Sequence, residues 1–261
     1  MQAGERILAL SPHACEILAA IGAVDEIVGV VEYCDYPEVL KLLPGVGGYN
    51  RIHVESAMSL KPTLAVVMND GTKAVKKLRK LGVPVVVSNP TNINGMLAEI
   101  RRLGVLSGHA QEAEMLVERL EQRLDTLDAL KADTLKTKGR IPVFYEIWPS
   151  PLIAAGGSSL IHDLLDRAGL ENVFADLPME GPRVNVEAVI RAAPELIIIP
   201  AENRNILERK RFWKQWLGED VSLISVHADL LHRPTPRLID GLEELMEQIS
   251  RLPAPQAIDH E

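Results

Sequence analysis

The chain has 261 residues, which is long for one small core and suits two lobes of roughly 100–150 residues each. Its formal net charge of −8 argues against a nucleic-acid binder, because such a protein needs a basic face to neutralise phosphates. No apolar run approaches the roughly 20 residues of a membrane span.

The N-terminal segment MQAGER passes directly into an apolar run, with no h-region and no cleavage site of a signal peptide. Two alternatives follow: a cytosolic protein, or a mature form whose leader has been removed.

The two cysteines, Cys15 and Cys34, lack the spacing of a zinc site. They can form one disulfide or stay as two partly buried free thiols, and of the two we favour the thiols.

Short apolar runs alternate with helical patterns along the chain, which predicts an α/β fold with parallel sheets covered by helices. Ser11 before Pro12 predicts an N-cap with proline at the first helical position, and the helix runs from about His13 to Ile21. The predicted strands are Ile7–Leu10, Ile27–Val31, Leu64–Val67, Val83–Val87, Val143–Ile147, Leu196–Ile199 and Leu223–Val226.

The span from about 111 to 136 predicts one long amphipathic helix, since it contains neither glycine nor proline and its leucines recur at helical spacing. A stiff helix midway along the chain is typical of a connector between two lobes. The leucines of its apolar face are Leu116, Leu120, Leu124, Leu127 and Leu130.

An internal repeat is the strongest signal in the chain. Residues 54–67 read VESAMSLKPTLAVV, and residues 186–199, which begin 132 positions later, read VEAVIRAAPELIII. In each copy a short helix ends near a proline and an apolar strand follows. The repeat predicts an N-terminal lobe at 1–108, a connecting helix at 109–138, a C-terminal lobe at 139–253 and a tail at 254–261.

A ligand cleft is expected between the lobes, because parallel sheets bind ligands beyond the carboxyl ends of their strands and interdomain clefts are preferred sites. Four of the seven Trp and Tyr residues follow predicted strands, which suits a flat or largely apolar ligand. The alternative is that these aromatics only pack the loops. They are Tyr33, Tyr36, Tyr49 and Trp148.

Three polar residues are further candidates. His13 at a helix start can ligate a metal centre in the ligand, although such a histidine more often forms a local hydrogen bond. Asp229 and Arg237 can contact ligand amides, the arginine through its planar guanidinium. The alternative for this pair is a capped turn and an ion pair at the start of the final helix, and we favour ligand contact for Arg237.

No catalytic set emerges, so the chain is expected not to be an enzyme. Ser158 lies in no GxSxG elbow, and no histidine and carboxylate are placed to activate a nucleophile. The stretch Gly156-Gly157-Ser158-Ser159 lacks the lysine and spacing of a phosphate-binding loop and predicts an ordinary helix N-cap.

Five segments spread over nearly the whole chain carry a resemblance to a known family: RILALSPHACEILAAIG, VGVVEYCDYP, LKPTLAVV, FYEIWPSPLIAAGG and RPTPRLIDGL. They resemble the cobalamin-binding substrate-binding proteins of bacterial ABC importers, in the helical-backbone class of periplasmic binding proteins. The resemblance implies two Rossmann-like lobes joined by one long α-helix. It also implies a monomer, periplasmic or lipid-anchored at the cell surface, that captures cobalamin without an intrinsic cofactor and delivers it to membrane permease subunits.

The resemblance also assigns ligand contacts by position. Tyr33 and Tyr49 would line the corrin site from the first lobe; Trp148, Arg237 and either Ile153 or Ile147 would line it from the second. Met68 and Gly181 stand where some family members carry tryptophan, so Trp148 is expected to supply replacement surface.

Glu55 and Glu187, which match in the repeat, gain a role through the same resemblance. An acidic residue on each lobe of these proteins docks onto arginines of the two membrane subunits, and complementary charge would set register and on-rate. The alternative is that a glutamate early in a helix merely favours the helix macrodipole.

Other functions stay open. A haem or ferric-siderophore binder of the same class is one, and a cytosolic corrinoid carrier or sensor is another. An enzyme with a related two-lobed fold would need cysteine ligands for a metal cluster, and two cysteines are too few.

Overall fold

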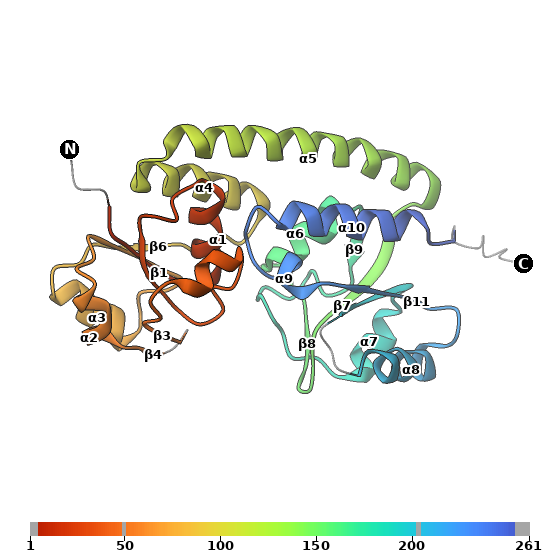
Figure 1. Cartoon of the computed structure of the whole chain (residues 1–261). Helices are drawn as coiled ribbons and strands as arrows, with labels where there is room; N and C mark the ends of the chain where they lie inside the picture. The colour runs from red at the N-terminus through yellow and green to blue at the C-terminus, as the bar shows by residue number, and fades with distance from the viewer. Residues whose placement is uncertain (1–4, 49–50, 202–204, 254–261) are drawn as a thin grey trace, which may run out of the picture. The chain divides into compact units, whose positions relative to one another are not determined.

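The computed structural model describes residues 5–48, 51–201 and 205–253. It divides into two compact units. The first unit takes in the described residues within 1–90, 94–121 and 233–236. The second unit takes in those within 91–93, 122–232 and 237–261. Helix α5 (Ala110–Lys138) confirms the predicted long helix, and it contributes residues to both units (Figure 1). Within the described ranges, no helix is long and apolar enough to cross a membrane. The predicted tail 254–261 lies outside the described residues.

The first unit is built on a parallel sheet with the strand order β2-β1-β5-β6. Ile7 pairs with Ile27 on one side and with Leu64 on the other. Strands β1 and β5 are buried along their whole length, which requires cover on both faces of the sheet. The elements are β1 (Ile7–Leu10), α1 (Pro12–Ala20), β2 (Ile27–Val30), η1 (Glu38–Leu42), β3 (Gly47–Gly48), β4 (Arg51–Ile52), α2 (Val54–Ser59), β5 (Leu64–Val67), α3 (Lys73–Lys80), β6 (Val85–Val87) and α4 (Ile93–Ser107).

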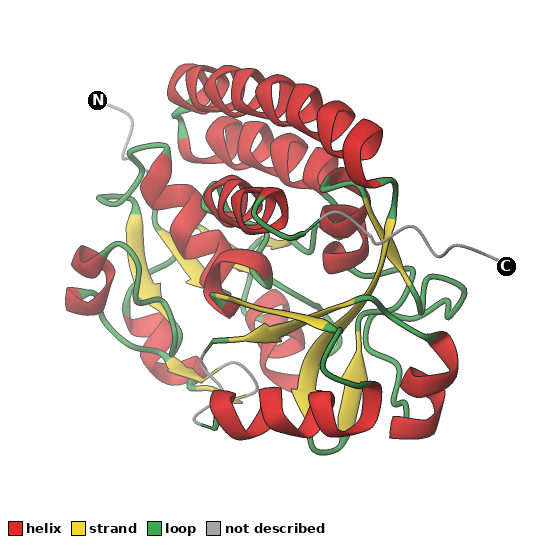
Figure 2. Ribbon diagram, turned by 90° about the vertical axis from the view of Figure 1, so that its right-hand side faces the viewer, coloured by secondary structure: helices red, strands yellow, loops and turns green. Residues whose placement is uncertain are grey.

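The second unit has a parallel sheet in which β7 pairs with β10, β10 with β11, and β9 with the first part of β7. Strand β8 pairs antiparallel with the last part of β7 and forms a hairpin. Helices flank the strands of each sheet (Figure 2). The elements are β7 (Ile141–Pro149), β8 (Leu152–Ala154), α6 (Leu160–Arg167), β9 (Leu170–Asn172), α7 (Val186–Ala192), β10 (Leu196–Pro200), α8 (Ile206–Leu217), β11 (Ser222–Val226), α9 (Ala228–Leu231) and α10 (Leu238–Ser250).

The two sheets repeat one topology, because the order β2-β1-β5-β6 corresponds to β9-β7-β10-β11. The repeat also extends to the backbone of the turn before each proline. Lys61 and Ala193 stand 132 positions apart and both adopt the left-handed conformation, with φ of 49° and 46°. Their amides donate to equivalent carbonyls, those of Met58 and Ile190. The structure therefore confirms the predicted duplication and the α/β fold.

One local prediction was confirmed in position and one was wrong. Ser11 occupies the N-cap position of α1 and Pro12 begins the helix, as predicted, although the Ser11 side chain makes no capping hydrogen bond. In α5 the apolar face is buried only as far as Leu127, whereas Leu130 is 52% exposed. The leucine spacing continues beyond the stretch that packs against the core, so periodicity alone overestimates the buried face.

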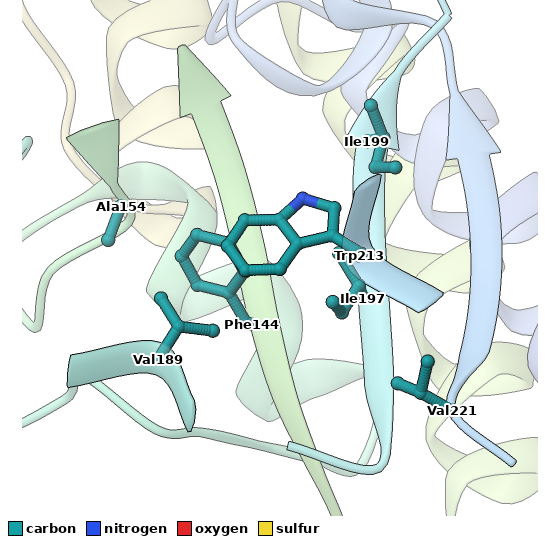
Figure 3. Packing of buried hydrophobic residues seen from close by; sticks show 7 residues of the cluster. All are labelled: Phe144, Ala154, Val189, Ile197, Ile199, Trp213 and Val221. Atoms are coloured by element: carbon teal, nitrogen blue, oxygen red, sulfur yellow. The ribbon is translucent and has the colours of Figure 1, made fainter. Parts of the chain in front are cut away.

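The core of the second unit gathers around Trp213 of α8 and Phe144 of β7 (Figure 3). Their ring centroids lie 5.2 Å apart at an interplanar angle of 68°, an edge-to-face arrangement that aromatic pairs prefer. Val189 of α7 belongs to the same cluster, so both helices that flank β10 in the chain are fastened to the sheet through it.

Cys15 of α1 and Cys34, in the loop after β2, form a disulfide, so the expectation of free thiols was wrong. The parallel pairing of β1 with β2 brings the two segments together, with a Cα–Cα distance of 5.9 Å that suits a disulfide. The bond ties the loop that carries Tyr33 to helix α1.

Loss of this disulfide should destabilise the first unit. The cysteines are 19 positions apart, and closing a loop of that length contributes about 3 kcal/mol to the free energy of unfolding in the chain-entropy account. We expect Cys15→Ser/Cys34→Ser to lower the urea midpoint, and a reducing agent to do the same to the natural sequence. The double-serine variant is the control, since reductant should leave it unchanged. Equal midpoints with and without reductant would contradict the account.

Candidate functional site

The first unit presents its candidate residues at the carboxyl edge of its sheet, because parallel strands end on the same side. His13 follows β1, Tyr33 follows β2 and Met68 follows β5. His13 Nε2 lies 2.9 Å from the carbonyl oxygen of Ser88 and 3.0 Å from its Oγ, which joins the segment after β1 to the one after β6. Together with the Cys15–Cys34 disulfide, this contact fixes three of the four segments that leave this edge.

Tyr33 combines exposure with an uncommon backbone conformation. Its side chain is 66% exposed and its φ is +70°, in the left-handed region that non-glycine residues rarely adopt. Such strain collects where the surrounding structure holds a residue for binding. Tyr36 in the same loop is also exposed. The exposure of these two tyrosines fits ligand contact, which stays a prediction. The third candidate tyrosine, Tyr49, lies outside the described residues.

His13, in contrast, is placed for structure. Its side chain is only 4% exposed, and its Nε2 is engaged by Ser88. Desolvation lowers the pKa of His13 to about 4, against a smaller opposite effect of the hydrogen bond to the Ser88 backbone, so the imidazole is neutral at neutral pH. Within the described residues no cluster of His, Cys, Asp or Glu could hold a metal ion. In this structure His13 is engaged by Ser88, and its role as a cobalt ligand stays a prediction.

In the second unit the β7–β8 hairpin carries two candidates side by side. Trp148 pairs with Ile153 across the hairpin and is 57% exposed, and its Nε1 donates to the carbonyl of Ser150 at 2.9 Å. Ile153 also bridges to Arg183, and a Cβ at Gly181 would lie 3.2 Å from its Cγ2. The absence of a side chain at Gly181 therefore leaves space that the Ile153 side chain partly fills. Ile153 lies opposite the exposed indole of Trp148.

Asp229 and Arg237 flank the segment that follows β11. Asp229 is exposed in the first turn of α9, and Arg237 is half-buried at the N-cap position of α10 without a side-chain cap. Helix α9 is fastened to the sheet because His232 Nε2 lies 3.0 Å from the hydroxyl of Tyr145 on β7. The arrangement fits polar contacts to a ligand, which stay a prediction.

The glycines at 156 and 157 serve packing, and no anion site is needed to explain them. A Cβ at Gly157 would lie 2.0 Å from the carbonyl oxygen of Ala175. The hydroxyl of Ser159 accepts a hydrogen bond from the amide of His162 at the start of α6. The prediction of an ordinary N-cap is confirmed.

Sequence reasoning missed a buried ion pair next to the hairpin. Glu146 of β7 is fully buried, and both of its oxygens lie 2.8 Å from Arg209 Nε. Trp213 Nε1 donates to the same carboxylate at 2.7 Å. The cluster anchors α8 to the strand that carries Trp148 two residues later. Its only signal in the sequence is a charged residue inside the apolar run VFYEIW.

A second missed cluster lies in the first unit beside the disulfide. Arg233 NH1 donates to Glu16 at 2.9 Å and to Asp35 at 3.0 Å, and these acidic residues directly follow Cys15 and Cys34. Glu16 is buried, so its charge needs such a partner. The disulfide thus holds two carboxylates around one guanidinium, next to the Tyr33 loop.

The repeated glutamates occupy equivalent positions, each the second residue of its helix, α2 or α7. Glu55 and Glu187 are both exposed. A hydrogen bond from Lys77 Nζ, at 2.6 Å, lowers the pKa of the Glu55 carboxyl, so Glu55 stays ionised well below neutral pH. The placement fits docking and equally fits stabilisation of the helix dipole, so docking stays a prediction.

Comparison with known proteins adds independent findings. Residues 7–215 match the family model of the periplasmic binding proteins. Vitamin B12-binding proteins of Yersinia pestis and Yersinia pseudotuberculosis are 30% identical over 261 residues, which cover 99% of this chain and 91% of theirs.

Solved structures show the same fold. The periplasmic vitamin B12-binding protein BtuF of Vibrio cholerae is 27% identical with a TM-score of 0.80, over 95% of this chain and 99% of that one. A periplasmic haem-binding protein from Pseudomonas aeruginosa has a TM-score of 0.83 at 23% identity, over 98% of this chain and 96% of that one. At this identity the haem-binding protein shows the fold alone.

The burial of neutral His13 should appear in the pH dependence of stability. The lowered pKa, about 4 in the folded state against about 6.5 unfolded, means that only the unfolded chain protonates His13 between these values. His13 therefore contributes stability above pH 6.5 that is lost as pH falls towards 4. Relative to His13→Asn, we expect the natural sequence to lose up to about 3 kcal/mol over this interval in urea titrations. Parallel curves for the two proteins would show that the burial is wrong.

Proposed function

This chain belongs to the periplasmic binding protein family, and we propose that it is the substrate-binding protein of an ABC importer that captures cobalamin or a related corrinoid. The carrying observation is 30% identity to vitamin B12-binding proteins over 99% of the chain. A binding protein of this kind performs no chemistry on its ligand and releases it unchanged to the permease.

The chemistry of the candidate residues supports a corrinoid, which is a large ring edged by amide side chains. Exposed Tyr33 and Trp148 would pack against the ring, because aromatic side chains add contact area with few rotatable bonds. Met68 and Ile153 would add apolar contact, and Arg237, with Asp229, would hydrogen-bond the amides. The expected cleft between the lobes is part of this proposal.

An oxidising compartment suits the structure. Disulfides persist in the periplasm and at cell surfaces, whereas cytosolic thiols are kept reduced. The Cys15–Cys34 disulfide therefore favours a periplasmic or surface location over a cytosolic corrinoid carrier. The match to the periplasmic binding protein family supports the same location.

Haem is the second candidate ligand, and one observation favours it. A tyrosine phenolate is an established axial ligand of haem iron, and the phenols of Tyr33 and Tyr36 are exposed in one loop. Haem titration distinguishes the two ligands directly. A shifted Soret band together with no response to cyanocobalamin would replace the corrinoid proposal.

Docking through Glu55 and Glu187 completes the proposal. Both carboxylates are exposed at equivalent positions of duplicated helices, so they present like charge on two similar lobes. A transporter with two related membrane subunits would offer one basic site to each. Charge pairs at such an interface set register and association rate.

Calorimetric titration with cyanocobalamin tests ligand binding. We expect one equivalent of cyanocobalamin to bind. Trp148→Ala should weaken binding at least tenfold, because an aromatic side chain that the ligand buries contributes on the order of 2 kcal/mol. Trp216→Ala is the matched control, since Trp216 is 50% exposed in the same unit but lies on α8, away from the carboxyl edge. No heat of binding, or an equal loss of affinity in both variants, would contradict the assignment.

Transporter binding by the cobalamin-loaded protein tests docking. We expect Glu55→Gln/Glu187→Gln to weaken binding to the permease at least tenfold, because each change removes a charge from an interfacial pair. Cyanocobalamin affinity should stay unchanged. A control variant, Glu118→Gln/Glu171→Gln, removes two exposed carboxylates elsewhere and should dock normally. Normal docking of the first variant would refute this role.

A further inference from the structure

Positive charge is concentrated in one segment of an acidic protein. Residues 51–80 contain seven Lys and Arg and two Asp and Glu, whereas the remaining 231 residues contain 21 basic and 34 acidic residues. The segment forms β4, α2, β5 and α3, and α2 and α3 lie side by side in the first unit (Figure 1). The chain therefore has a local basic surface, although its net charge is −8.

Helix α3 carries most of this charge on one face. Its buried side chains are Val75 and Leu78, which pack towards the core. Its exposed lysines recur at positions i, i+3, i+4 and i+7, which places them in one stripe along the helix. This lysine face consists of Lys73, Lys76, Lys77 and Lys80.

The stability of the helix accounts for only part of the lysine face, because the helix dipole favours Lys77 and Lys80 in the last turn. Lys73 lies in the first turn, where the helix dipole disfavours a cation. Lysines four positions apart, such as Lys76 and Lys80, repel each other. Within the described part of the chain, Lys77 pairs with Glu55, and no ion pair engages Lys73, Lys76 or Lys80. The pattern calls for an anion from outside the chain.

We propose that the lysine face of α3 binds the anionic headgroups of a phospholipid bilayer when the protein docks at the membrane. That this face meets the membrane during docking rests on the proposed function. Lys77 donates a hydrogen bond to Glu55, so the predicted docking carboxylate lies on the same surface as the lysine face. A row of ammonium groups meets a planar array of phosphates, and each lysine near such a surface strengthens binding roughly fivefold. This contact keeps the protein beside the permease.

The composition of the face favours lipid over an acidic protein partner. Protein interfaces are depleted of lysine and enriched in arginine and aromatic residues, and the face consists of lysines. Lysine is a hydrated point charge on a flexible stem, which suits a diffuse negative potential better than a shaped pocket.

Helix α8 of the second unit carries its cations in a different arrangement. Helix α8 follows β10 as α3 follows β5, but two of its cations are already paired. Arg209 is bound to buried Glu146, and Lys214 pairs with Glu219 at 2.6 Å. The proposed membrane contact therefore uses the lysine face of α3.

Sedimentation with vesicles tests the proposal without permease or ligand. Vesicles of phosphatidylcholine and phosphatidylglycerol in a two-to-one ratio are compared with pure phosphatidylcholine at low salt. We expect binding to the anionic vesicles alone, weakened by salt, and lowered at least tenfold in Lys73→Gln/Lys76→Gln/Lys80→Gln. Lys77 is kept so that its pair with Glu55 survives.

Two controls separate this surface from net charge and from the proposed function. Lys41→Gln/Arg119→Gln/Lys136→Gln removes the same charge from other exposed positions and should bind anionic vesicles like the natural sequence. Cyanocobalamin titration of each variant reports the proposed function separately, and it should be unchanged. No preference for anionic vesicles, or equal loss in both triple variants, would overturn the proposal. Weaker permease binding of the α3 variant without any vesicle binding would assign the face to an acidic protein surface and overturn it too.

Discussion

The parallel pairing of β1 with β5, and of β7 with β10, is the interaction on which the rest of the structure depends. Strands β1 and β5 are buried throughout and β10 almost throughout, so helices must cover both faces of each sheet. The carboxyl ends of the parallel strands bring the following segments to one edge of each sheet. The left-handed residue before each proline turns a short helix into β5 or β10. One module, used twice, therefore places both the candidate ligand loops and the repeated glutamates.

The loops at this edge are held by bonds between distant segments. In the first unit the Cys15–Cys34 disulfide and the bond from Arg233 to Asp35 hold the loop of Tyr33, and the contact of His13 with Ser88 joins two neighbouring segments. In the second, the buried Glu146 pair and the bond from Tyr145 to His232 support the strand of Trp148. Exposed aromatics thus stand on a rigid base, which limits the entropy lost when a ligand binds.

Features written as local patterns were predictable, and features created by folding were not. Proline and glutamate in register revealed the repeat, and leucine spacing revealed α5. The disulfide was not expected, because only the β1–β2 pairing brings Cys15 and Cys34 together. His13 looked available in the sequence, but the segment after β6 buries it. Arg233 and Glu16 are 217 positions apart, and no pattern in the sequence joins them. For the candidate site, the sequence predicted the residue types and the loops that carry them. The structure alone revealed how exposed these side chains are and which bonds hold their loops.

Hydrogen exchange with and without cyanocobalamin tests the proposal that the segments at the carboxyl edges of both sheets bind a corrinoid. The account predicts slower exchange on ligand addition in residues 31–36, at the end of β2, and in residues 148–153 and 227–237. The rest of each sheet should change little, since its amides are already paired. Protection confined to one unit, or protection away from the carboxyl edges, would contradict the account.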